Sequence, residues 1–290
     1  MRRWLALLLL LVGSACAHAL QVTDDRGTRV EFTQPPRRIV SLLPSLTEFV
    51  CALQACERLV GVDDYSNHPP SVRALPHVGG LEDARIESIV ALKPDLVLVP
   101  TSSRALDRLQ SLGLKVLALE PRTFADVQRV LGLLGPVLGT PDAQGVWRRI
   151  EQDLEAAARA LPPHLRGTRV YFEVSGAPHA ASESSFIGEV LAKLGLRNIV
   201  PGALGPFPRL NPEFVVRADP QWILVADDDV TRLPSRPGWA AMRALREGRV
   251  CVFTAAQGDV LVRAGPRMAE AARLMVRCLR GELAAGGAAR

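Results

Sequence analysis

The chain contains an internal repeat, ESIVALKPDLVLV at residues 87–99 and EFVVRADPQWILV at residues 213–225, whose two copies align without a gap. Each copy begins with Glu, is interrupted by a proline (Pro94 or Pro220) and continues into an apolar run. Proline stops a helix, and a continuous apolar run is typical of a strand that is covered on both faces. The repeat therefore predicts a short helix followed by a parallel strand, twice in the chain.

The segments around the two copies also match each other. Before each copy we expect a strand and then a helix, and after each copy a helix, a glycine and a strand. The expected strands are residues 38–43, 114–119, 169–174 and 249–253, and the expected helices are residues 45–53, 104–112, 185–194 and 238–247. Strands that alternate with helices predict an α/β protein with two parallel-sheet lobes.

Two helix starts have local signals. Ser45-Leu-Thr-Glu48 matches a capping box, in which Ser45 and Glu48 satisfy backbone N–H groups at a helix N-terminus. Asn211 before Pro212 is typical of an N-cap followed by a proline in the first turn. Near the N-terminus, residues 21–32 predict a hairpin around Asp25-Arg26-Gly27.

A single long helix is expected between the lobes, over residues 140–163. Thr140 would cap it, Pro141 would begin it and Pro162 would end it. Its apolar stripe comprises Val146, Ile150, Leu154 and Leu161. About 20 residues would span roughly 30 Å, so this helix should hold the lobes (residues 20–139 and 164–290) rigidly, with a ligand cleft between them.

The first 19 residues are typical of a secretory signal peptide. Arg2 and Arg3 precede a short apolar segment, and Ala17-His18-Ala19 is an A-x-A cleavage site, so we expect a periplasmic chain that begins at Leu20. The apolar segment is too short to span a bilayer. The alternative is a lipid anchor on Cys16, although Gly13 stands where such sites usually have Leu.

The four remaining cysteines permit two disulfides in an exported protein. Cys251 and Cys278 are candidates to join a strand to the last helix. Cys51 and Cys56 would be about 7.5 Å apart along a continuous helix, so they can pair only if the helix ends near Leu53. Buried free thiols are the alternative.

Composition and motifs exclude several classes of protein. A chain that is 48% hydrophobic and 22% charged is globular. Its net charge of +5 is not gathered into a basic block, so no nucleic-acid partner is expected. We find no nucleotide-binding glycine motif, no nucleophile elbow and no zinc-type Cys/His spacing. The sequence thus predicts a non-enzymatic monomer without a cofactor or metal site, and an exported α/β enzyme is the rival.

Two aromatic residues are candidates for ligand contact. Tyr65 follows the apolar run at residues 59–62, and the carboxyl ends of parallel strands line ligand crevices. Phe207 lies between two prolines in a loop. Either ring could instead pack its own loop.

Four stretches, taken in order, resemble the periplasmic solute-binding proteins of iron-chelate and cobalamin ABC importers. They are RIVSLLPSLTE (residues 38–48), VGVDDYSNHPP (60–70), ESIVALKPD (87–95) and RAGPR (263–267). The resemblance covers nearly the whole mature chain and is strongest to the cobalamin-binding branch. It implies capture of a metal chelate, a corrinoid first and haem or a ferric siderophore as alternatives, for delivery to a permease dimer and its ATPase.

The resemblance also implies roles for particular residues. In the cobalamin branch, the corrin is contacted by the position that matches Tyr65 and by a stretch that we expect to be a loop here: Asp259, Val260, Leu261, Val262 and Arg263. Phe207 stands where the family has a tryptophan. The cobalamin branch has aromatic residues at the positions of Val260 and Leu261, and a tryptophan-glycine pair where this chain has Gly79-Gly80. The expected cleft of this chain is therefore less aromatic than that of the cobalamin branch. Glu87 and Glu213 match acids that dock on permease arginines. Compensation of a helix dipole is the simpler alternative for both.

Overall fold

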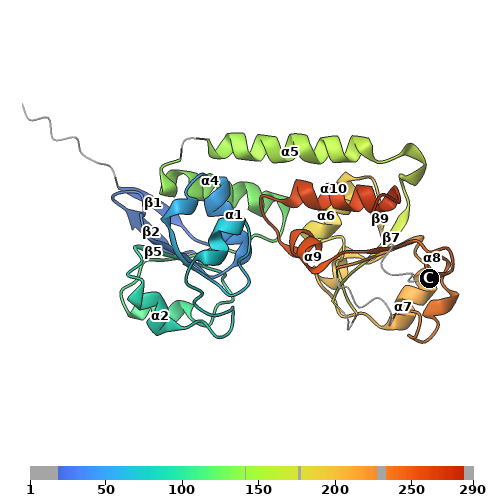
Figure 1. Ribbon diagram of the computed structural model, residues 1–290, viewed down its shortest axis with the longest axis horizontal. Helices are drawn as coiled ribbons and strands as arrows, with labels where there is room; N and C mark the ends of the chain where they lie inside the picture. Colours follow the sequence, from blue (N-terminus) through green and yellow to red (C-terminus); the bar gives the residue numbers. More distant parts are fainter. Residues whose placement is uncertain (1–18, 141, 176–177, 227–232, 284–290) are drawn as a thin grey trace, which may run out of the picture.

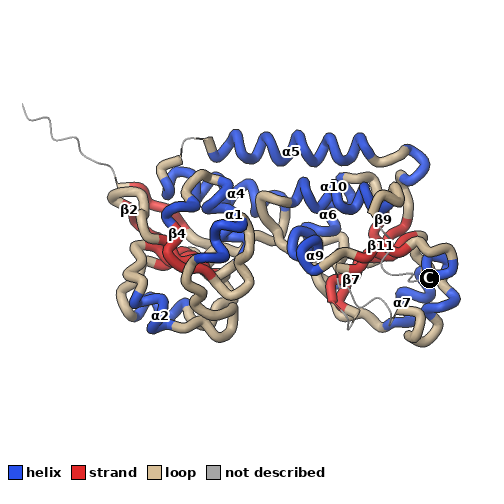
Figure 2. The backbone as a smooth tube through the Cα atoms, in the orientation of Figure 1, coloured by secondary structure: helices blue, strands red, loops and turns tan. Residues whose placement is uncertain are grey.

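A computed structural model describes residues 19–140, 142–175, 178–226 and 233–283 (Figure 1). Two lobes lie side by side, and one long helix, α5 (Ala143–Ala160), runs along both of them. Each lobe is a sheet with helices on its two faces (Figure 2). Among the described helices, none is long and apolar enough to cross a membrane. Of the expected leader, residues 1–19, all but Ala19 lie outside the described residues, so its prediction stands as made.

The first lobe is built on a parallel sheet of order β4-β3-β5-β6. Its strands are β3 (Ile39–Ser41), β4 (Leu59–Val62), β5 (Leu96–Val99) and β6 (Val116–Ala118). Its helices are α1 (Pro44–Ala52), α2 (Ile86–Ala91), α3 (Leu106–Ser111) and α4 (Phe124–Leu138). The predicted hairpin is confirmed, because β1 (Leu20–Thr23) pairs antiparallel with β2 (Arg29–Phe32).

The second lobe is built on a sheet in which β11, β10 and β7 are parallel neighbours. Its strands are β7 (Arg169–Ser175), β8 (His179–Ala180), β9 (Arg197–Asn198), β10 (Trp222–Val225) and β11 (Val250–Val252). Its helices are α6 (Phe186–Lys193), α7 (Pro212–Ala218), α8 (Arg243–Arg246), α9 (Ala255–Val262) and α10 (Met268–Leu279). Both short strands pair with β7, β8 antiparallel and β9 parallel.

The internal repeat is confirmed at the level of topology. The two copies form α2 and β5 in one lobe, and α7 and β10 in the other. The order β3-β5-β6 in the first sheet matches β7-β10-β11 in the second. Every residue of β5 is buried, as its unbroken apolar sequence predicts. The N-cap at Asn211 is also confirmed, because its side chain accepts a hydrogen bond from the backbone N–H of Glu213.

One hydrophobic core continues from lobe to lobe. It begins under α1, passes through α4 and α5, and ends between α10 and the second sheet. The predicted stripe of α5 is buried in it: Val146, Ile150, Leu154 and Leu161. Smaller cores lie on the opposite face of each sheet, under α2 and α3 and under α7 and α8. The long helix is therefore packed along its length rather than suspended between the lobes.

The expected start of the long helix is wrong by a few residues. The helix begins at Ala143, with Asp142 in the N-cap position. Thr140 belongs to the end of the preceding helix, since its hydroxyl donates to the backbone oxygen of Gly135. That helix, α4, ends at Leu138 and is capped by Gly139, whose φ of 65° is readily adopted only by glycine.

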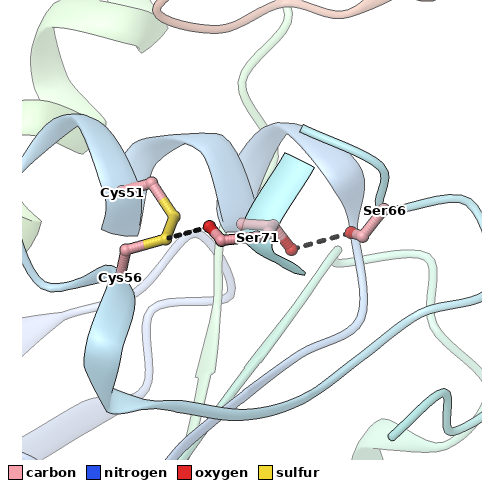
Figure 3. Close-up of a disulfide and its surroundings, with 5 residues drawn as sticks. Cys51, Cys56, Ser66 and Ser71 are labelled. Atoms are coloured by element: carbon pink, nitrogen blue, oxygen red, sulfur yellow. Dashed lines mark hydrogen bonds between the residues drawn. A yellow bond between two sulfur atoms is a disulfide. The ribbon is translucent and has the colours of Figure 1, made fainter. Parts of the chain in front are cut away.

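Two disulfides are present, Cys51–Cys56 and Cys251–Cys278. Helix α1 ends at Ala52, and Gln54 then takes a left-handed conformation with φ of 60°. This turn brings the Cα atoms of Cys51 and Cys56 to 4.2 Å, so the condition for pairing is met (Figure 3). The second disulfide joins β11 to α10, as expected. Each bridge lies within one lobe.

Candidate functional site

A cavity of about 480 Å³ lies between the lobes. The first lobe contributes the residues that follow β3 and β6, which include Ser45 and Arg122. The second lobe contributes Phe186, Phe207 and the end of α9. The carboxyl ends of parallel strands thus form one wall, which is where ligands bind in open α/β sheets. We take this cavity as the candidate ligand site.

Phe207 is one of the apolar walls of the cavity. The residue is 42% exposed, and its ring meets Phe186 edge to face, with 6.3 Å between ring centroids. Pro44, Pro121 and Pro206 add rigid apolar surface beside it. A half-exposed ring that is held by a second ring offers a flat surface to a planar ligand. Phe207 therefore lines the cavity, and its contact with a ligand stays a prediction.

Arg263 lies at the end of α9, both at the cavity and at the junction between the lobes. Its guanidinium donates to the side chains of Glu48 (3.2 Å) and Asn67 (2.8 Å) and to the backbone oxygen of Tyr65 (3.0 Å). It also forms an ion pair with Asp259 at 2.9 Å. The side chain is only 9% exposed. Arg263 is therefore held in the wall of the cavity by its hydrogen bonds and its ion pair.

Glu48 is the buried anion of this junction, with a side chain that is 2% exposed. Arg267 donates to both of its carboxylate oxygens, at 3.0 and 2.7 Å. The capping box predicted for Ser45 and Glu48 is wrong. The helix starts one residue earlier at Pro44, which has no backbone N–H, and Leu43 is the N-cap. Glu48 is thereby free to join the first lobe to the second.

The loop that carries Tyr65 is fixed by its backbone rather than by its ring. Asp63, which is buried, accepts hydrogen bonds from the backbone N–H of Tyr65 (2.8 Å) and the hydroxyl of Ser66 (2.5 Å). Burial raises the pKa of the Asp63 carboxyl, although these bonds and the charge of Arg263 oppose the shift. Tyr65 is 67% exposed, and its ring lies against Gly80. It is not among the residues that line the cavity.

The expected contact stretch after β11 is a helix, not a loop. Thr254 and Gln257 form a capping box that begins α9, and the helix includes Asp259 to Val262. Val262 and Arg263 reach the cavity. Asp259 holds Arg263 and accepts a hydrogen bond from Asn67 at 2.6 Å.

Val260 and Leu261 are buried in the hydrophobic core. The expectation that these two side chains contact a ligand is not supported, because the helical turn points them inward.

The two acids of the repeat have equivalent positions. Glu87 and Glu213 are both exposed in the first turn of a short helix. Neither carboxylate has a hydrogen bond or ion pair within the described part of the chain. Helices α2 and α7 lie on the side of the two lobes that faces away from α5 (Figure 1).

Some residues of the site escape the sequence analysis. Glu48, Asn67 and Arg267 meet only because two lobes pack together, and no local pattern reveals this. Arg122 could have been found, since it follows the apolar run that becomes β6, and such positions line ligand crevices. In the described ranges, no group of three or more His, Cys, Asp or Glu side chains is arranged to hold a metal ion.

Comparison with known proteins identifies the family of this chain. A family model described as periplasmic binding protein matches residues 39–256. The chain belongs to the periplasmic binding protein family. An uncharacterized ABC transporter substrate-binding lipoprotein from Bacillus subtilis is 26% identical over 268 residues, which are 86% of this chain and 82% of that protein.

Other relatives of this periplasmic binding protein have named ligands. The vitamin B12-binding protein of Pectobacterium atrosepticum is 26% identical and covers 82% of this chain and 86% of its own. The solved vitamin B12-binding protein of Vibrio cholerae has a TM-score of 0.69 and 25% identity, over 86% of this chain and 98% of that one. A periplasmic heme-binding protein from Pseudomonas aeruginosa has a TM-score of 0.73 and 27% identity, over 84% and 92%.

Proposed function

We propose that this chain captures a corrinoid in the periplasm and delivers it to an ABC importer. The observation that carries the proposal is the cavity between the lobes, with Phe207 and Phe186 on one wall and Arg122 and Arg263 beside them. The vitamin B12-binding proteins among the relatives support a corrinoid as the ligand. Haem or a ferric siderophore is the alternative, and the exported enzyme has no specific observation in its favour.

Titration tests this proposal. Calorimetry with cobalamin, cobinamide, haem and ferric siderophores should give saturable micromolar or tighter binding for a corrinoid. Binding of haem or a siderophore with no heat from any corrinoid would exclude the corrinoid and keep the cavity as the site. Trp222, at the start of β10 in the second lobe, offers a fluorescence readout of the same titration.

Tyr65, whose backbone oxygen accepts a hydrogen bond from Arg263 of the cavity wall, gives a sharper test. Tyr65→Ala should weaken corrinoid binding by about 1–3 kcal/mol, the scale of an aromatic anchor. Folding should be unaffected, because the loop is held by the backbone N–H and oxygen of Tyr65, which alanine retains. Tyr65→Phe is the matched control and should bind almost as well as the wild type. Equal binding by all three proteins would remove Tyr65 from the site.

Export precedes capture in this proposal. Cleavage before Leu20 gives a free periplasmic protein, whereas lipidation of Cys16 gives an anchored one. The mass of the mature chain distinguishes the two forms.

A further inference from the structure

Three charged side chains line the candidate cavity: Glu120, Arg122 and Arg263. They differ in whether the charged group is already paired within the protein, and only an unpaired group is available to a ligand. Arg263 is committed to Glu48, Asp259, Asn67 and the Tyr65 backbone, and its charge is compensated by two acids. It is therefore part of the wall rather than a free cation.

Glu120 is also committed. One of its oxygens, Oε2, accepts hydrogen bonds from the backbone N–H of Thr101 (2.9 Å) and from its hydroxyl (2.7 Å). The nearby acids Asp25 and Asp126 share a different partner, Arg129, which forms ion pairs with both. The acids near Arg122 are thus paired with groups other than its guanidinium.

Arg122 is the cation that remains. Its backbone is fixed, because its N–H donates to Asp126 at 3.1 Å and the next residue, Thr123, is the N-cap of α4. Its guanidinium is exposed and has no hydrogen bond or ion pair within the part of the chain that the structure describes. A fixed backbone with an uncommitted guanidinium is suited to bind an anionic oxygen group of a ligand.

We infer that Arg122 determines ligand specificity by pairing with an anionic group of the chelate, while the apolar part of the chelate lies against Phe207. The inference rests on the proposed function and deepens it. The anionic group is a phosphodiester if the ligand is a complete cobalamin, and a carboxylate if the ligand is haem. In both cases the guanidinium recognises charged oxygens.

The test compares ligands that differ in this group. Cobalamin has a phosphodiester and cobinamide lacks it; haem has two carboxylates and its dimethyl ester lacks them as anions. Arg122→Ala should weaken binding of whichever anionic ligand the wild type takes by about tenfold. It should leave the affinity for the matched ligand without the anion unchanged. Added salt should weaken binding of the anionic ligand to the wild type more than its binding to Arg122→Ala.

Arg108→Ala is the matched control, because it removes an exposed arginine from α3 of the same lobe, away from the cavity. It should change no affinity. If Arg122→Ala weakens binding of both ligands of a pair equally, or of neither, Arg122 does not recognise the anionic group and the inference is wrong. A wild-type protein that binds none of the four ligands contradicts the proposed function itself, and the inference falls with it.

Discussion

At the scale of single residues, Glu48 has the largest consequences. Its carboxylate is almost completely buried and neutralises Arg263 and Arg267, whose side chains are 9% and 15% exposed. Glu48→Gln keeps the volume but removes the buried anion that the two guanidinium groups share, which leaves Arg263 with Asp259 and Arg267 with Glu270 at 3.9 Å. Breaking a buried pair in this way costs about 3–5 kcal/mol. We therefore expect a decrease of that size in the free energy of unfolding, measured by denaturant titration.

An exposed ion pair supplies the control for this prediction. Glu82 pairs with Arg104 at 3.5 Å, and both side chains are more than 70% exposed. Glu82→Gln should change the free energy of unfolding by less than about 1 kcal/mol, because solvent screens exposed pairs. Similar effects for Glu48→Gln and Glu82→Gln would contradict the role assigned to the buried junction.

At the scale of elements, α4 and α6 form a second contact between the lobes. Glu189 of α6 accepts a hydrogen bond at 2.6 Å from the backbone N–H of Phe124, the first residue of α4. Burial raises the pKa of Glu189 above its ordinary value of 4.5, against the effect of that bond. An acid with a raised pKa in the folded state disfavours folding as it ionises, so its cost is absent below pH 4.5 and grows as the pH rises.

Glu189→Gln removes this cost and keeps an acceptor for Phe124. The variant should therefore be more stable than the wild type near neutral pH, and the difference should vanish below pH 4.5. Denaturant titrations across the pH range would measure this. Stability curves that stay parallel at all pH values would show that ionisation of Glu189 does not affect the contact.

At the scale of the whole molecule, three connections restrict movement of the lobes. They are the packed helix α5, the Glu48 junction and the contact from Glu189 to α4. The 18 residues of α5 alone span roughly 27 Å. We expect small-angle scattering profiles with and without ligand to differ little. A large decrease in the radius of gyration on binding would contradict this rigid connection.

The same arrangement places one exposed acid of each lobe on a common side of the molecule, which fits docking on a two-fold permease. Glu87→Ala and Glu213→Ala should leave stability and ligand affinity nearly unchanged and weaken binding to the permease complex, the double variant most. High salt should weaken the wild-type interaction in the same way, because exposed charge pairs are screened. Wild-type transport by the double variant, or a loss of its stability, would favour the helix-dipole interpretation.

Features that depend on neighbouring residues could be predicted from the sequence. The repeated helix and strand, the hairpin and the stripe of α5 follow from hydrophobic periods and from proline and glycine positions, which act over a few residues. Capping signals are less dependable. Thr254 and Gln257 do cap α9, whereas Ser45 and Glu48 match the same pattern and do not cap α1.

The tertiary structure alone decided the site. Glu48 and Arg263 are 215 positions apart, and Glu48 and Arg267 are 219 apart, so nothing local determines that they meet. Val260 and Leu261 match a ligand-contacting stretch in sequence, but the rotation of α9 places them in the core. Arg122 is one exposed arginine among many until the packing of two lobes encloses a cavity beside it. The sequence by itself determined two α/β lobes and their connecting helix, because these depend on local periodicity, and the packing of the lobes determined which charges are buried, paired or free.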